Sequence, residues 1–393
     1  MKAQMDTILN GIYTALRTST NKDISLMGGR SGIVLFNFAY LKYQGPGDHT
    51  NEDDLPIQEL AERSLEEMRD PGFSTGTAGL NWLFAYLYKN EILAKEDWEF
   101  LCSGDAGLET TALNLLRHGN YDFLHGAIGI GHYFLYTGTS GSGVFFTLFF
   151  DLLNELVYKS STGTIIPGFD FTQYKCLPDE VNLGFSHGLA GILKFCLQCY
   201  KQNICTTASK ILAQRIIDYL LDNMNLDRSI NYFPNKIMEG RRTDEYSRLG
   251  WCYGDLGIAY TLYQSGMLFD DRRLVNLAVE ILEHTTTRRM ETTTQVRDAG
   301  VCHGTAGIAH LYNRIWYSTR QPVFKEACDF WMQRTIDFAL YSNGLAGYEK
   351  YNARNGIYEN CHELLEGAAG IGLVFLSYLT GDLSWDYCLM LND

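Results

Sequence analysis

Proline, long apolar runs and excess positive charge are all scarce in this chain, and each scarcity excludes a class of protein. Only 7 of its 393 residues are proline, which argues against a Pro-rich linker protein. The longest apolar stretches, near Leu80–Tyr88 and Val144–Phe150, are far shorter than the ~20 residues of a transmembrane helix. With 32 basic against 46 acidic residues and no basic stripe, the chain lacks the charge pattern of a nucleic-acid-binding protein.

The N-terminal sequence also lacks the apolar core of a signal peptide. Residues 1–22 instead have the pattern of an amphipathic helix. We therefore expect a cytoplasmic protein. Its ten cysteines are then predicted to be reduced thiols, some of them available to a metal, and not a disulfide framework.

Glycine is abundant, with 38 residues, and its placement is periodic. The pattern Gly-x-x-Gly-(Ile/Leu) occurs seven times, at intervals of 47 to 66 residues between first glycines. The seven first glycines are Gly29, Gly76, Gly126, Gly188, Gly254, Gly304 and Gly367. Because each copy opens an apolar stretch, we interpret them as one structural repeat.

The stretch after each motif has helical periodicity, as Ile192, Phe195, Cys196 and Cys199 illustrate. More polar amphipathic stretches lie between the motifs, so each repeat is predicted to hold two helices. The glycines permit positive φ and close backbone approach where the first helix begins. We predict an all-α fold and a single domain spanning residues 1–393. A closed α/α toroid with the motif loops at one end is favoured over an open solenoid, because no polar capping repeat is evident.

Three connections between the predicted helices are longer than the rest. Residues 137–143 read as a flexible loop, residues 44–55 as a polar acidic loop, and residues 159–185 as a hairpin or a lid.

Residues typical of a metal site stand directly before two of the motifs. Cys252 lies two residues before Gly254, and Cys302 and His303 directly precede Gly304. Two thiolates and one imidazole are ligands that zinc favours, and three protein ligands leave the open fourth position of a catalytic site. Because metal coordination deprotonates a thiol, the set predicts alkylation or addition by a substrate thiol.

Acid–base chemistry has candidates in neighbouring loops. Asp122 and His187 are suited to proton transfer, and Arg248 to pairing with Asp122 or to stabilising an anion. The alternatives are a helix N-cap for Asp122 and a structural loop imidazole for His187. Two further pairs are interpreted as non-functional: Cys196 and Cys199 as core residues, and Cys361–His362 because it lies too far before Gly367.

Taken together, these motifs resemble the LanC-like lanthionine synthetase cyclases. The matching pieces span about Asp6 to Tyr378: WCYG at 251–254, CHG at 302–304, SHGLAGI at 186–192 and the seven glycine motifs. The resemblance implies an α/α toroid of seven inner and seven outer helices, with one zinc ion per chain at its mouth. Carried over by motif, the zinc ligands are Cys252, Cys302 and His303, and the active-site residues are Asp122, His187, Arg248 and Tyr253.

The resemblance also implies an activity, the addition of a peptide cysteine thiol to dehydroalanine or dehydrobutyrine to form (methyl)lanthionine rings. The substrate is then a dehydrated precursor peptide, and a separate dehydratase is expected because 393 residues leave no room for a dehydratase domain. Stabilisation of the resulting enolate falls to His187 or Arg248, and proton delivery to His187 or a zinc-bound water. Asp122 either takes the thiol proton or orients His187. Alternatives are a glutathione-adding or repurposed zinc thiol transferase, a different toroid enzyme such as a prenyltransferase or glycosidase, and a non-catalytic peptide-binding scaffold.

Overall fold

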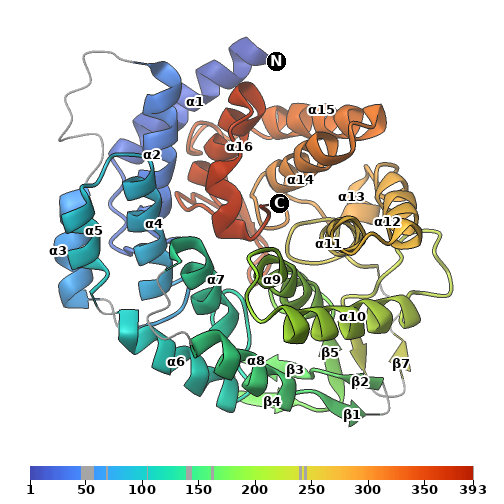
Figure 1. Cartoon of the computed structure of the whole chain (residues 1–393). Coiled ribbons are helices and arrows are strands. Elements are labelled where there is room, and N and C mark those ends of the chain that lie inside the picture. The colour runs from blue at the N-terminus through green and yellow to red at the C-terminus, as the bar shows by residue number, and fades with distance from the viewer. Residues whose placement is uncertain are drawn as a thin grey trace. The chain divides into compact units, whose positions relative to one another are not determined.

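The computed structural model describes residues 1–45, 57–67, 70–103, 105–138, 144–160, 163–238, 241–242 and 246–392 (Figure 1). The chain divides into two compact units. Unit 1 consists of Met1–Arg69, Leu249–Trp251 and Arg289–Asn392, and unit 2 of Asp70–Arg248 and Cys252–Arg288. The single domain inferred from the sequence stays a prediction.

A helix begins directly after the first glycine of each of the seven motifs, as predicted. Unit 1 contains α2 (Arg30–Gln44), α14 (Thr305–Thr319) and α16 (Ala368–Thr380). Unit 2 contains α4 (Thr77–Lys89), α7 (Ala127–Thr137), α9 (Leu189–Lys201) and α11 (Asp255–Leu268). Most side chains of these helices are buried, which explains why their apolar residues are not confined to one face.

Close backbone approach is the main reason for glycine at these helix starts. Among the seven first glycines, all within the described chain, only Gly254 has a positive φ, of +91°. A Cβ at any of the seven would come within 3 Å of the loop that precedes it. The expected need for positive φ is therefore limited to Gly254, and steric exclusion accounts for the other six.

The repeat extends six residues further upstream than the glycine pattern indicated. In five repeats the position six residues before the first glycine is Asp or Asn, and its side chain accepts a hydrogen bond from the backbone N–H two residues later, at 2.8 to 3.3 Å. These residues are Asp23, Asp70, Asn120, Asn182 and Asp298. The remaining two repeats have Arg248 and Cys361 at this position. An Asx turn thus shapes most of the loops that lead into the motif helices.

Amphipathic helices fill the intervals, and α12 illustrates why they form. The Asp271 carboxylate caps it by accepting the N–H groups of Arg273 and Leu274, and its buried residues lie on one face. With α12 (Arg272–Thr285) included, these helices are α1 (Lys2–Arg17), α3 (Ile57–Glu67), α5 (Lys95–Leu101), α6 (Asp105–Arg117), α8 (Phe145–Glu155), α10 (Thr206–Asp222), α12, α13 (Glu291–Thr294) and α15 (Pro322–Asp337). The predicted N-terminal amphipathic helix is α1. In the described part of the chain, no helix combines the length and apolarity needed to cross a membrane.

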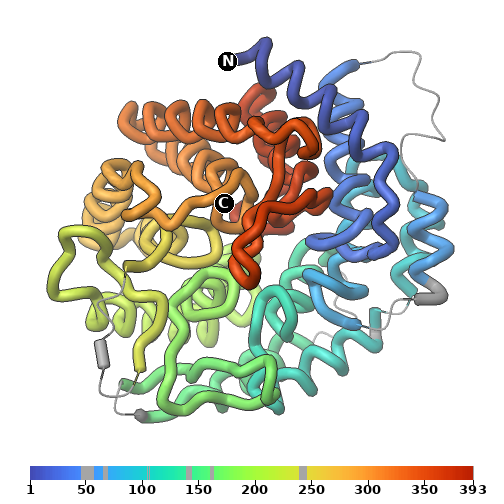
Figure 2. The backbone as a smooth tube through the Cα atoms, turned by 180° about the vertical axis from the view of Figure 1, so that it is seen from behind, coloured from blue at the N-terminus to red at the C-terminus, as the bar shows by residue number. Residues whose placement is uncertain are grey.

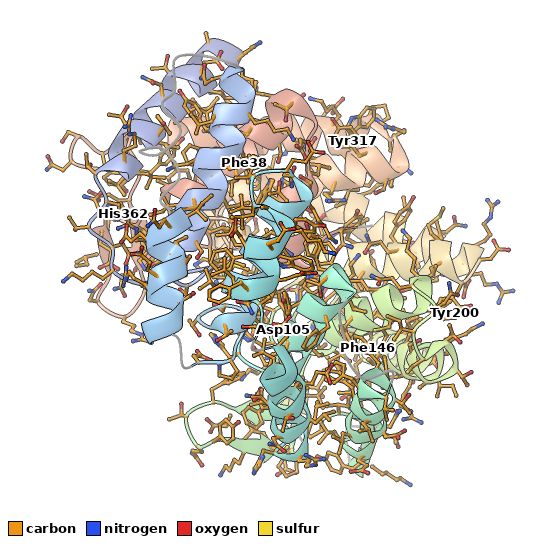
Figure 3. All side chains as sticks on the ribbon, turned by 60° about the vertical axis from the view of Figure 1, so that its left-hand side comes forward. Phe38, Asp105, Phe146, Tyr200, Tyr317 and His362 are labelled. Carbon is orange, nitrogen blue, oxygen red and sulfur yellow. The ribbon has the colours of Figure 1, made fainter. Side chains whose placement is uncertain are left out.

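Motif helices pack on one another within each unit, and interval helices cover them. In unit 2, α7 contacts α4 and α9, and α9 contacts α11, while α6, α10 and α12 pack on α7, α9 and α11 respectively. In unit 1, α16 lies between α2 and α14, and α15 runs alongside α14 (Figure 1). Polar contacts add to this packing: the Asp105 carboxylate accepts hydrogen bonds from Asn81 of α4 and Tyr133 of α7 (Figure 3).

Short strands connect some of the helices. The hairpins β1 (Tyr158–Ser160) with β2 (Gly163–Ile165) and β3 (Gly168–Asp170) with β4 (Lys175–Leu177) confirm the hairpin alternative for residues 159–185. In unit 2, β5 (Glu180–Asn182) pairs with β6 (Lys236–Met238), and β6 with β7 (Arg241–Arg242). The long connection between α15 and α16 carries the hairpin of β8 (Lys350–Asn352) and β9 (Ile357–Glu359) (Figure 2). Most of the loops predicted at 44–55 and 137–143 lies outside the described residues.

Unit 1 contains a buried charged cluster centred on Asp386 in the 3-10 helix η1 (Ser384–Leu389). The Asp386 carboxylate is fully buried and accepts hydrogen bonds from His310 Nε2 at 2.6 Å and from the guanidinium of Arg314 at 2.5 and 2.6 Å. Burial alone would raise the pKa of Asp386, but Arg314 and His310 lower it below its usual value. The carboxylate is therefore ionised at neutral pH, and it ties η1 to α14.

Asp386→Asn is expected to lower the free energy of unfolding by about 3 kcal/mol at pH 7, because Arg314 would lose its buried partner. The pKa of folded Asp386 lies below that of the unfolded chain, so its carboxylate stabilises above the unfolded pKa of about 4. This contribution is lost as the pH falls through the folded pKa. Urea unfolding should show a difference between wild type and variant at pH 7 that shrinks in acid, and equal midpoints at pH 7 would contradict the assignment.

Candidate active site

In unit 2, the loops before α9 and α11 are joined through the backbone of Cys252. The N–H groups of Phe185 and Ser186 both donate to the Cys252 carbonyl oxygen, at 2.9 and 3.3 Å. Directly after β5, the Leu183 N–H donates to Asn235 O at 3.0 Å, which also ties this loop to the segment before β6. The loop that ends at His187 is thereby joined to the backbone of Cys252.

His187 and Asp122 form a hydrogen-bonded pair, although they lie 65 residues apart in the sequence. The distance between His187 Nδ1 and Asp122 Oδ2 is 2.7 Å. The Asp122 side chain is fully buried, whereas that of His187 is 25% exposed. The second carboxylate oxygen of Asp122 accepts the His125 N–H at 2.7 Å. Asp122 is not the N-cap of α7, because Gly126 occupies that position.

The pair changes the protonation of the imidazole. Burial lowers the pKa of His187, but the charge of Asp122 and the hydrogen bond to it raise that pKa by more, so it lies above its usual value. Because Nδ1 donates to the carboxylate, Nε2 is the nitrogen left to face a substrate. The arrangement thus provides an oriented imidazole that holds a proton more firmly than a free histidine.

Aromatic rings surround His187. The Tyr253 ring centroid is 6.2 Å from that of His187, and the Tyr253 hydroxyl accepts a hydrogen bond from Asn182 Nδ2 at 3.0 Å. Phe171, in the turn between β3 and β4, has its ring centroid 5.7 Å from that of His187. The His125 ring lies parallel to His187, with centroids 6.2 Å apart. Sequence reasoning missed Asn182, Phe171 and the ring of His125, and of these only Asn182 carries a signal, the Asx turn.

Arg248 occupies the start of the loop that leads to Cys252, and its side chain is half-buried. Within the described residues, the partners of the Asp122 carboxylate are His187 and His125, so the suggested Arg248–Asp122 pair does not form. The neighbouring Ser247 carbonyl accepts a hydrogen bond from Arg288, which also lies 3.6 Å from the buried carboxylate of Asp255. These contacts brace the loop in which Arg248 lies.

Unit 1 contributes Cys302 and His303, whose side chains are half-buried. The Cys302 sulfur and a ring nitrogen of His303 lie within 4.8 Å of each other. The N–H of Cys302 donates to Leu365 O at 2.8 Å, and the Cys302 carbonyl accepts the Trp251 N–H at 3.1 Å. Gly250 packs against the same loop, since a Cβ there would be 3.2 Å from His303 Cα. Cys252 is the residue peptide-bonded to Trp251, one Cα–Cα step of about 3.8 Å further along the chain.

The cysteines that sequence reasoning set aside lie elsewhere. Cys196 and Cys199 are fully buried in α9, as predicted for core residues. Cys361 is buried, and burial raises the pKa of its thiol, while burial lowers the pKa of the adjacent His362 (Figure 3). The neutral thiol of Cys361 and the neutral imidazole of His362 are therefore favoured, which suits a structural role better than a reactive one.

Comparisons with known proteins give a consistent result. A family described as "Lanthionine synthetase C-like protein" matches residues 20–390. The nisin biosynthesis protein NisC of Lactococcus lactis subsp. lactis is 24% identical over 226 residues, 54% of this chain and 49% of that protein, so the alignment spans about half of its length. The solved structure of a nisin cyclase matches with a TM-score of 0.76 at 19% identity, over 99% of this chain and 97% of that chain.

The structural match shows that the predicted fold class, an all-α α/α toroid, is correct. A weaker similarity, to an alpha-1,6-mannanase from Salegentibacter, has a TM-score of 0.46 and 10% identity, which is too low to support an inference.

Proposed function

Because the chain belongs to the lanthionine synthetase C-like family, we propose that it is a zinc-dependent lanthipeptide cyclase. It adds a cysteine thiolate of a dehydrated precursor peptide to dehydroalanine or dehydrobutyrine in the same peptide, forming lanthionine or methyllanthionine. The observation that carries the proposal is the combination of a two-thiol, one-imidazole donor set with the Asp122–His187 pair, whose loop binds the Cys252 backbone.

The donor set fits zinc. Cys252, Cys302 and His303 offer two sulfurs and one nitrogen, which match the preference of zinc for soft ligands and leave a fourth position open. When bound, zinc would lower the pKa of a substrate thiol and keep it as a thiolate at neutral pH. We expect one ion per chain.

His187 supplies the proton that completes the addition. Attack of the thiolate on the β-carbon of the dehydro residue forms the C–S bond and moves negative charge onto the carbonyl oxygen as an enolate. The α-carbon must then receive a proton, and His187 Nε2 is the oriented donor for it. Asp122 acts by orienting the imidazole and stabilising its protonated form, which its hydrogen bond favours over a role in accepting the thiol proton.

Arg248 and Tyr253 are suited to the enolate. The Tyr253 oxygen accepts a hydrogen bond from Asn182, so its O–H remains able to donate to a developing oxyanion. Arg248 is half-buried and is not paired with Asp122. Its guanidinium provides a positive charge in the loop that leads to Cys252. Both roles are electrostatic stabilisation, and neither residue transfers the proton in this scheme.

The proposal extends to partners and location. The substrate needs dehydrated serine or threonine residues, so a dehydratase must act before this protein, and we propose that it is a separate enzyme in the cytoplasm. We further propose that residues 1–393 act together as one cyclase domain.

The test combines metal analysis with a cyclisation assay. Purified protein should contain about one zinc per chain by elemental analysis. Because ring closure leaves the peptide mass unchanged, free thiols in a dehydrated peptide are counted by iodoacetamide labelling and mass spectrometry. Labelling should disappear on incubation with the protein, return after chelation, and disappear again when zinc is restored. Persistent thiols with the zinc-loaded protein would refute the cyclase, and addition of glutathione to a cysteine-free dehydrated peptide would favour the glutathione alternative.

A further inference from the structure

The segment that contains η1 is one of the most deeply buried parts of unit 1. Residues 388–391 are 0 to 2% exposed, and Asp386 fixes the helix to His310 and Arg314 of α14. Burying a charge is costly unless the charge is fully paired, and Asp386 is paired with both His310 and Arg314. The cluster therefore holds η1 at one position against α14.

That position matters because Trp251 hydrogen-bonds to η1. The indole Nε1–H of Trp251, a residue only 1% exposed, donates to the backbone oxygen of Leu389 at 3.1 Å. Trp251 also donates its own N–H to the carbonyl of Cys302 at 3.1 Å. Its side chain is thus tied to η1 and its backbone to the loop of one proposed zinc ligand.

Trp251 is also bonded covalently to a second proposed ligand, Cys252. The hydrogen bond from the indole to η1 therefore restricts the position of Trp251, the residue directly before Cys252. Through the Trp251 N–H it also restricts the backbone carbonyl of Cys302. Residues outside the first coordination shell commonly contribute 10- to 100-fold to metal affinity by holding ligands in place.

We propose that η1 and Trp251 form a clamp that positions Cys252 and Cys302 for zinc. The clamp consists of His310, Arg314, Asp386, the Leu389 carbonyl and Trp251. Trp251 is a positioning residue, which acts through the cysteines and not on the substrate. This inference rests on the zinc site of the proposed function.

Trp251→Phe tests the clamp, because it keeps an aromatic ring and removes only the indole N–H. We expect zinc affinity, measured by competition with a chromogenic chelator, to fall about ten-fold. Trp385→Phe is the matched control. Trp385 also lies in η1 and is buried, but its Nε1–H donates to Ser377 Oγ of α16 at 2.7 Å and not to a group of the clamp. Phenylalanine keeps an aromatic ring against His310, whose ring centroid lies 5.0 Å from that of Trp385. The control variant should lose a comparable amount of thermal stability and keep wild-type zinc affinity.

Asp386→Asn provides a second test from the opposite end of the clamp, should Trp251→Phe fail to fold. It is also expected to weaken zinc binding. If both act through η1, the double variant should lose less affinity than the product of the two single losses, because neighbouring effects through one contact are not additive.

The outcomes separate this inference from the proposed function. Wild-type protein without zinc would remove the proposed zinc site itself. Wild-type protein that binds zinc, together with unchanged affinity in Trp251→Phe or equal losses in Trp251→Phe and Trp385→Phe, would overturn the clamp and leave the zinc site standing.

Discussion

Cys302→Ala is expected to abolish both zinc retention and thioether formation while leaving the helical fold intact. The substitution removes one of three proposed ligands. Its effect should exceed the 10- to 100-fold loss in metal affinity that is typical when a residue that only supports a ligand is changed. The fold should survive because Cys302 is half-buried at a loop and contributes little to the core. Elemental analysis after dialysis measures the metal, circular dichroism the helix content, and iodoacetamide labelling the remaining thiols.

Cys361→Ala is the matched control for this variant. Cys361 is also followed by a histidine and precedes a glycine motif, but it is buried and lies six residues before Gly367 instead of two before its glycine. It should retain about one zinc per chain and wild-type turnover. Full metal retention in Cys302→Ala, or loss of metal in both variants, would contradict the ligand assignment.

The second large effect is expected on kcat, when His187 is replaced. His187→Asn should keep zinc and lower kcat by about 10²- to 10⁴-fold, the usual contribution of a positioned acid–base group. Asparagine retains an N–H that can donate to Asp122, so the loop should stay in place. His118→Ala is the control, because His118 is exposed in the same unit and its Nδ1 hydrogen-bonds to the nearby backbone oxygen of Asn114 at 2.8 Å. Turnover like that of wild type in His187→Asn would remove His187 from the mechanism.

Asp122→Asn is expected to shift the pH dependence of kcat. The protonated form of His187 is the proposed acid, so kcat should decline as the pH rises through its pKa. Asp122 is the chief cause that raises this pKa, and burial opposes it. Without the carboxylate the pKa should fall, and the decline in kcat should begin at lower pH than in wild type. An alkaline limb that does not move would show that another group donates the proton.

Sequence patterns predicted the local structure well, and the motif helices show why. Each GxxG copy defines a helix start through contacts within six or seven residues, such as the hydrogen bond from the Thr77 N–H to Asp70 O at 2.8 Å. The helix that follows depends on bonds between residues four apart. A regular pattern of short-range interactions can be recognised in a single sequence. The position of cysteine and histidine directly before a motif glycine is also a local spacing, so it could be recognised in the same way.

Which side chains pair with one another was harder to predict from the sequence. From the sequence, Asp122 was compatible with an N-cap, a partner of Arg248 or a residue that orients His187. The structure selects His187, 65 residues away, whose Nδ1 lies 2.7 Å from Asp122 Oδ2. The Asp386 cluster, which joins residues 72 and 76 positions apart, left no recognisable motif in the sequence.

The sequence by itself therefore determined the repeat, the all-helical class and the residue types offered as metal ligands, since all of these depend on local spacing. The tertiary structure alone decided which carboxylate orients His187, that Arg248 is not paired with Asp122, and that Trp251 is fastened to η1. These contacts join segments far apart in the chain. Their geometry depends on how helices and loops pack, which no short-range pattern encodes.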